Sequence, residues 1–217
     1  MKNEFYLRII SSIILLPLSL FFIINGSFYF NILIFTCFIV ALYEWYKMCK
    51  DRIYFYFGLI FLLFSFYTVY FIRTNFNDEY IFFILILLIC IFTDIGGYII
   101  GKIFKGPKLT KISPNKTYSG MIGGYLLSTS ILLLFIFNYV TQSFASLDLM
   151  TNEFFFIIII STASQIGDII ISYFKRLSKI KDTGNIIPGH GGLLDRIDGM
   201  IFAYPTFYII YLASGIF

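Results

Sequence analysis

Long apolar runs alternate with short polar segments along the whole chain. The first run has no charged residue from Ile9 to Tyr43. As a single helix it would be roughly 50 Å long, well beyond the ~30 Å hydrocarbon core of a bilayer. The chain must therefore turn back inside this run, and the sequence Asn-Gly-Ser at 25–27 predicts where the turn lies.

The same pattern predicts an all-α, polytopic transmembrane helical bundle of about seven spans. No separate soluble domain is expected, so residues 1–217 are interpreted as one integral-membrane catalytic domain. Its N-terminal spans would lie within 1–72, and its catalytic spans and loops within 80–217. The predicted spans are 6–24, 28–46, 53–72, 80–103, 121–140, 153–174 and 199–217.

Composition supports this class of protein. Hydrophobic residues make up 59% of the chain and charged residues 13%, and the mean hydropathy is +0.87. These values exclude an ordinary soluble domain. The three cysteines (Cys37, Cys49 and Cys90) are odd in number and widely spaced, so they are interpreted as packing residues. The first span lacks a small-residue cleavage site and is expected to be retained.

The distribution of positive charge predicts the orientation. With seven spans and a cytoplasmic N-terminus, fifteen of the sixteen lysines and arginines fall on the cytoplasmic side, and only Arg73 falls outside. This asymmetry is the one that membrane insertion favours. The charged segments 104–120 and 175–198 would then face the cytoplasm, where nucleotides are found. Abundant Ile, Phe, Asn, Lys and Tyr indicate an AT-rich genome and a bacterial inner membrane.

A polar stripe runs along predicted span 6. Ser161, Gln165, Asp168 and Ser172 fall within roughly 60° of one another on a helix, and Lys175 continues the stripe. A carboxylate within a span costs several kcal/mol unless it is paired or hydrated. Asp168 is therefore a candidate metal ligand or proton-transfer group. A structural Asp–Lys pair, or a polar face that holds helices together, is the alternative.

The segment after span 6 combines glycines, acids and bases. "PGHGG" at 188–192 surrounds the chain's only histidine, His190, and such a loop lets backbone N–H groups approach an anion. His190 is interpreted as a phosphate contact or a proton-transfer group, with loop packing as the alternative. Asp195 and Asp198, three residues apart, would share a helix face if span 7 starts there. Carboxylates favour Mg²⁺ and basic side chains favour phosphates, which together suit a metal–nucleotide substrate.

The segment after span 4 forms the second half of the pattern. Asp94 lies inside the span, beside glycines that also allow close helix contact. Lysines, Pro and Gly then alternate up to Lys116, which indicates an ordered cationic loop or a contact with anionic lipid. Glu44, next to the expected interfacial aromatics Trp45 and Tyr46, is noted without a role.

These motifs resemble those of the phosphatidate cytidylyltransferases, also called CDP-diacylglycerol synthases. "SYFKRLSKIKDTGNIIPGHGGLLDRID", residues 172–198, matches the signature of that family throughout. Upstream, "SQIGD" and "DIGGYIIGK…SPNKT" are similar to its other motifs, so the resemblance is tight over 94–198. The sequence departs from the family pattern at Ile95, Lys102 and Ser119, and individual roles for these three residues are in doubt.

The resemblance implies that CTP and phosphatidic acid give CDP-diacylglycerol and pyrophosphate with Mg²⁺, at an active site facing the cytoplasm of the inner membrane. The resemblance also allows a second bound cation, either monovalent or divalent, and a homodimeric assembly. No nucleic acid partner is expected. The implied metal ligands are Asp168 and Asp195. The implied catalytic residues are Lys116, Lys175, Arg176, Lys181, Asp182, His190, Arg196 and Asp198. The implied substrate-binding residues are Asp94, Ser113, Thr117, Ser172, Gly189, Gly191 and Gly192.

Three other functions were weighed. The CDP-alcohol phosphatidyltransferases are also small and polytopic, but their D-G-x-x-A-R…G-x-x-x-D-x-x-x-D pattern is not found here. CTP-dependent lipid kinases of the dolichol- or phytol-kinase type have a related architecture but transfer the γ-phosphate. A transporter would use the polar stripe as an ion path, yet transport does not require the sequence "GHGGLLDRID".

Overall fold

The computed structural model describes residues 2–50, 52–75, 80–140, 147–189 and 191–214. Within these residues the chain forms α-helices joined by short loops, and no β-strand. The predicted all-α class is therefore confirmed. The helices are α1 (Lys2–Asn25), α2 (Ser27–Cys49), α3 (Tyr54–Asn75), α4 (Ile81–Phe104), α5 (Tyr118–Val140), α6 (Leu147–Leu177), α7 (Leu194–Ile197) and α8 (Met200–Ser214).

The predicted turn at 25–27 is confirmed. α1 ends at Asn25, α2 begins at Ser27, and Gly26 between them has a φ of 62°, a conformation that glycine adopts without steric cost. Arg73, near the end of α3, donates hydrogen bonds to the carbonyls of Ile23 (2.9 Å) and Ile24 (3.3 Å). Arg73 thus satisfies carbonyls at the end of α1.

Each predicted span corresponds to one helix, but the count of seven spans stays a prediction. Among the described residues, four helices are both long and apolar enough to cross a bilayer: α2, α3, α4 and the 154–177 part of α6. The apolar parts Ile13–Asn25 of α1 and Met200–Ala213 of α8 are shorter. These helices make the chain a helical membrane protein.

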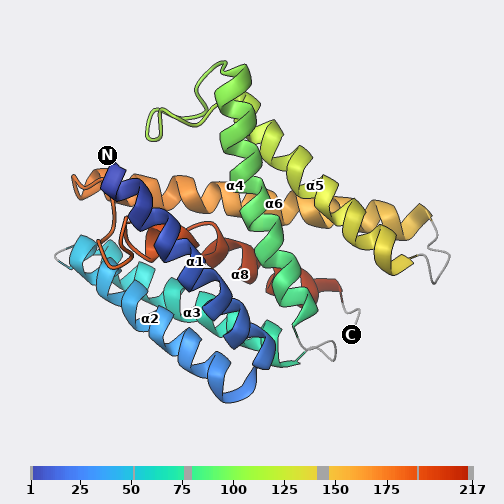
Figure 1. The fold of residues 1–217 in the computed structure, drawn as a ribbon, viewed down its shortest axis with the longest axis horizontal. Coiled ribbons are helices and arrows are strands. Elements are labelled where there is room, and N and C mark those ends of the chain that lie inside the picture. The colour runs from blue at the N-terminus through green and yellow to red at the C-terminus, as the bar shows by residue number, and fades with distance from the viewer. Residues whose placement is uncertain (1, 51, 76–79, 141–146, 190, 215–217) are drawn as a thin grey trace.

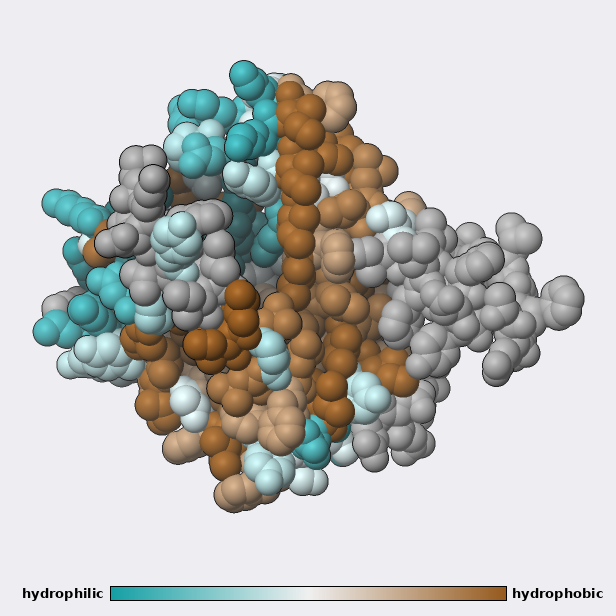
Figure 2. All heavy atoms as spheres, in the orientation of Figure 1, coloured by the Kyte–Doolittle hydropathy of each residue, from teal (hydrophilic) through white to brown (hydrophobic). Residues whose placement is uncertain are grey.

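The helices place their polar ends together. Figure 1 shows the start of α1 and the ends of α2, α4 and α6 toward the left and top of the view, where the loops carrying the motifs lie. Figure 2, in the same orientation, shows hydrophilic residues gathered at the upper left, while apolar residues cover most of the remaining coloured surface. The two charged segments predicted to share one side of the membrane do lie at one end of the bundle.

Helices α4 and α5 make close backbone contact. A Cβ atom added to Gly123 of α5 would lie 2.7 Å from the carbonyl oxygen of Gly96 in α4, and one added to Gly120 would lie 2.7 Å from that of Gly97. Because real Cβ atoms do not approach oxygen so closely, this contact requires glycine on α5. Gly96, two residues after Asp94, likewise has no room for a Cβ against the Gly123 carbonyl oxygen, so this glycine serves helix packing.

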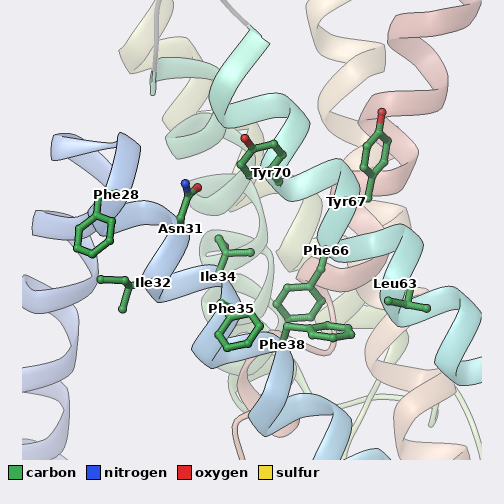
Figure 3. A pocket seen from close by; sticks show the side chains of 10 residues that line it. All are labelled: Phe28, Asn31, Ile32, Ile34, Phe35, Phe38, Leu63, Phe66, Tyr67 and Tyr70. Atoms are coloured by element: carbon green, nitrogen blue, oxygen red, sulfur yellow. The ribbon is translucent and has the colours of Figure 1, made fainter.

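The core surrounds α8, whose fully buried Tyr204 donates a hydrogen bond to the carbonyl of Phe83 in α4 (3.1 Å). A separate apolar groove of about 590 Å³ lies between α2 and α3. Figure 3 shows that apolar and aromatic side chains and Asn31 line it. The groove holds no carboxylate, lysine or arginine, so its lining offers no groups for phosphate chemistry.

Candidate active site

An ion pair connects the α4–α5 loop to the polar stripe of α6. Lys116, at the end of the α4–α5 loop, pairs with the carboxylate of Asp168 in α6. The Asp168 carboxylate also accepts a hydrogen bond from Ser172, one turn later (3.3 Å). The Lys116 and Asp168 side chains are 24% and 29% exposed, so the pair lies near the surface of the site. The polar stripe predicted on span 6 thus meets the lysine loop.

The α4–α5 loop is held in a defined shape by its own backbone. The Leu109 amide donates to the carbonyl of Lys116 (2.8 Å), and the Lys116 amide donates to the carbonyl of Ser113 (3.0 Å). The Thr117 hydroxyl accepts from the amide of Gly120 (3.1 Å), which caps the start of α5. Ser113 and Thr117 therefore shape the loop that presents Lys116, and contact of either residue with substrate stays a prediction.

Asp195 of α7 organises the second segment. One carboxylate oxygen accepts from the ammonium of Lys175 in α6 (2.7 Å). The other accepts from the Thr183 amide (2.8 Å), the Thr183 hydroxyl (3.1 Å) and the Gly192 amide (3.1 Å). Burial acts to raise the pKa of Asp195, but the hydrogen bonds from Lys175 and the two amides outweigh it and hold that pKa below its usual value. Asp195 is thus a charged anchor for the loop.

Glu44 of α2 is the residue that sequence reasoning missed. Its side chain is 1% exposed, and its carboxylate accepts from the amides of Leu193 (2.9 Å) and Leu194 (2.8 Å) and from the hydroxyl of Thr183 (2.8 Å). Glu44 is the first charged residue after a 35-residue uncharged run (9–43). That position was the one sequence feature that distinguished it.

Two glycines of the signature make room for Glu44. A Cβ atom on Gly184 or Gly192 would lie 2.7 Å or 2.6 Å from an oxygen of the Glu44 carboxylate. The glycines around His190 were predicted to let a substrate anion approach the backbone. At Gly192 a carboxylate of the protein itself makes that approach, and substrate binding by Gly192 stays a prediction. Gly189 and Gly191 have φ angles of 75° and 89°, which suit glycine.

Asp198 brings a further carboxylate close to Asp168 and Asp94. Asp198 follows α7, is 8% exposed, and accepts a hydrogen bond from the amide of Gly199 (2.9 Å). Burial and the negative charges of Asp168 and Asp94 raise the pKa of Asp198 well above its usual value, against the effect of Lys175. Asp94, Asp168 and Asp198 thus converge from α4, α6 and the α7–α8 junction.

The expectation that Asp195 and Asp198 share a face of the last span needs correction. The sequence "LDRI" forms the separate short helix α7, and α8 begins only at Met200. Gly199 between them packs on Ser164 of α6, where an added Cβ would lie 3.1 Å from the Ser164 carbonyl oxygen. The two helices are separate, and Asp195 pairs with Lys175 while Asp198 lies near Asp168 and Asp94.

The donor chemistry of the site fits Mg²⁺, which prefers carboxylate oxygens. Asp168 and Asp195 each form an ion pair with the ammonium of a lysine. Both carboxylates therefore have an oxygen in a position where it binds a cation. Within the described part of the chain, no group of three or more Asp, Glu, His or Cys is arranged as a ready-made metal site. Magnesium binding by Asp168 and Asp195 stays a prediction.

The remaining predicted residues lie around the edge of the site or outside the description. Arg176 donates to the carbonyl of Ile180 (3.1 Å) at the end of α6, and Lys181, Asp182 and Arg196 are exposed. His190 lies outside the described residues, so its predicted role is not addressed.

Comparison with known proteins identifies the family. The model of the cytidylyltransferase family matches residues 6–76 and 50–214. The phosphatidate cytidylyltransferase of Rickettsia bellii is 37% identical over 96% of this chain and 91% of its own length. That of Rickettsia prowazekii is 36% identical over 96% and 92%. That of Staphylococcus haemolyticus is 39% identical over 65% of this chain and 53% of its own length. By its motifs, its helical membrane fold and these matches, the chain belongs to the cytidylyltransferase family.

Proposed function

We propose that this protein transfers CMP from CTP to phosphatidic acid, giving CDP-diacylglycerol and pyrophosphate. The observation that carries the proposal is the ion pair between Lys116 and Asp168, because it joins the two motif-bearing segments into one charged site. Relatives matched over most of their length have the name phosphatidate cytidylyltransferase.

The arrangement of charges suits this reaction. A phosphate oxygen of phosphatidic acid would attack the α-phosphorus of CTP, so that a new P–O bond forms while the bond to the β-phosphate breaks and pyrophosphate leaves. Both reactants are anions, so neutralising charge and holding the reacting groups in line are the main requirements. Lys116, Lys175 and Arg196 would supply positive charge to the phosphates.

Magnesium would be held by Asp168 and Asp195, with Asp94 and Asp198 adding negative charge nearby. A bound Mg²⁺ supplies charge neutralisation for transferring and departing phosphates. Since Asp168 and Asp195 each hold a lysine ammonium, a metal ion would share or replace those lysine contacts. Displaced lysines would be free to contact phosphate oxygens.

The site would face the cytoplasm of a bacterial inner membrane. Positive charge concentrates at the polar end of the bundle, which is the cytoplasmic end in the favoured orientation. Lipid tails would remain in the bilayer while the phosphate head group reaches the polar end. CTP would arrive from the aqueous side.

The test is an assay of purified protein with CTP, phosphatidic acid and Mg²⁺, in which the lipid product and pyrophosphate are both measured. We expect one CDP-diacylglycerol per pyrophosphate and no transfer in excess EDTA, with recovery on adding Mg²⁺. Release of CDP with a phosphorylated lipid would instead identify a CTP-dependent lipid kinase and overturn the proposal.

A further inference from the structure

We propose that Glu44 is a positioning residue that holds Thr183 and the 193–195 part of the signature segment in their reactive arrangement. This inference rests on the proposed function for its kinetic test, but its structural test does not. Glu44 belongs to α2, within the region 1–72 to which sequence analysis gave no part in the chemistry.

The environment of Glu44 is built for a carboxylate. Removing a carboxylate from water has a large free-energy cost unless hydrogen bonds replace the lost hydration. Glu44 is 1% exposed, and it accepts hydrogen bonds from two consecutive backbone amides, Leu193 and Leu194, and from the Thr183 hydroxyl. Thr183 lies at the beginning of the signature loop, and Leu193 and Leu194 lie at its end. The Glu44 side chain therefore holds these two parts of the loop together.

Glu44 is coupled to the charged residues through Thr183. The Thr183 hydroxyl lies within hydrogen-bond distance of both Glu44 (2.8 Å) and Asp195 (3.1 Å), and Asp195 in turn binds Lys175 (2.7 Å). A shift of Glu44 would therefore move Thr183 and, through it, the Asp195–Lys175 pair. Because misplacing reacting groups by about 1 Å can cost roughly 100-fold in rate, such a shift would be felt in turnover.

Two side-chain contacts link the helix that carries Glu44 to the C-terminal end of α6 and the residue that follows it. Trp45 packs edge-on against Phe174 of α6, with ring centroids 5.1 Å apart, and the Ser178 hydroxyl donates to the carbonyl of Met48 (2.9 Å). A carboxylate on a packed helix is a more precise support than one on a loop. These contacts, together with the hydrogen bonds of Glu44 to Leu193, Leu194 and Thr183, link α2 to the loop that binds Lys175 through Asp195.

The kinetic test compares Glu44→Gln with Lys47→Gln, an exposed residue one turn later on the same helix. Glutamine keeps the size of glutamate but replaces one acceptor oxygen with an NH₂ donor that would face an N–H or O–H donor. We expect kcat of the folded, monodisperse Glu44→Gln protein to fall at least ~10-fold. Lys47→Gln should retain wild-type kcat and KM values.

Thr183 provides a second pair of variants in case Glu44→Gln fails to fold. Thr183→Val removes the shared hydroxyl and should also lower kcat, whereas Thr183→Ser keeps the hydroxyl and should restore most of the loss. If both residues act through one contact, the combined Glu44→Gln/Thr183→Val loss should be smaller than the product of the two single losses.

The structural test is hydrogen exchange at the amides of Leu193 and Leu194, which needs no catalytic activity. In Glu44→Gln we expect both amides to exchange at least ~10-fold faster, while amides in the middle of α3 and α8 stay as in wild type. Unchanged exchange at Leu193 and Leu194 would overturn the inference even if the protein is an active transferase. Faster exchange in a protein that transfers no CMP would leave the positioning role intact and refute the proposed function alone. Uniformly lowered stability, with normal kcat in the folded fraction, would show a purely structural role.

Discussion

Lys116 and Asp168 lie 52 positions apart in the sequence, yet they form an ion pair that joins the α4–α5 loop to α6 at the polar end of the bundle. The pair is partly exposed, so its contribution to stability is small. Its position suggests instead that Lys116 is available for exchange between a protein carboxylate and a substrate phosphate.

Replacement of Lys116 should therefore reduce activity and leave the fold intact. We expect Lys116→Ala to lower turnover by at least ~100-fold, because loss of one contact to transition-state charge typically costs ~3–4 kcal/mol. Lys111→Ala, an exposed lysine of the same loop, is the matched control. Steady-state transfer assays and thermal unfolding in detergent measure both effects. Near-normal activity of Lys116→Ala would mean that the loop only contacts lipid.

The Lys175–Asp195 pair should behave differently, because it is buried. The two side chains are 11% and 8% exposed, and breaking a buried pair leaves one charge uncompensated, at a cost of about 3–5 kcal/mol. We expect Lys175→Met and Asp195→Asn each to lower both the unfolding temperature and activity. Unfolding of the double variant should show a smaller loss than the sum of the single losses. Strictly additive losses would show that the two residues do not stabilise each other.

The glycine contact between α4 and α5 predicts a contrast between two substitutions. Gly123→Ala would force its Cβ against the Gly96 carbonyl (2.7 Å), whereas Gly97→Ala would make only ordinary contact with the Gly120 carbonyl (3.6 Å). We expect Gly123→Ala to lose about 1–3 kcal/mol of stability and Gly97→Ala to lose clearly less, apart from any helix-propensity gain. Thermal unfolding of the two proteins decides the question, and equal losses would contradict the described packing.

The proposed orientation, with the polar end of the bundle in the cytoplasm, predicts which introduced cysteines a membrane-impermeant thiol reagent can label. The reagent is applied to intact vesicles that are either inverted or right-side-out. A cysteine replacing the exposed Lys111 should react only from the cytoplasmic face, and one replacing the exposed Asn75 only from the opposite face. Both variants are made in a chain whose three native cysteines are replaced by serine or alanine. Labelling of position 111 from outside would refute the orientation.

The membrane fold was predictable because a charge-free run longer than a bilayer must turn, and the turn at Gly26 needs only local sequence. A pair between Asp168 and a lysine was one of the alternatives predicted from the sequence, but the sequence did not identify Lys116 as that lysine. Glu44 was not predictable as part of the signature loop, because a single sequence does not show which helix end packs against residues 139 to 150 positions away. The separate helix α7 was missed because residues at its two ends make long-range contacts, Leu194 with Glu44 and Gly199 with Ser164, that local sequence does not show.

The most direct test of the account uses CTP labelled either on the α-phosphate or on the γ-phosphate, supplied to purified protein with phosphatidic acid and Mg²⁺. A site that transfers CMP must place the α-label in the lipid and release the γ-label as pyrophosphate. We predict this result for the wild-type protein and its strong reduction in Lys116→Ala. Appearance of the γ-label in the lipid, with the α-label remaining in soluble CDP, would contradict the account.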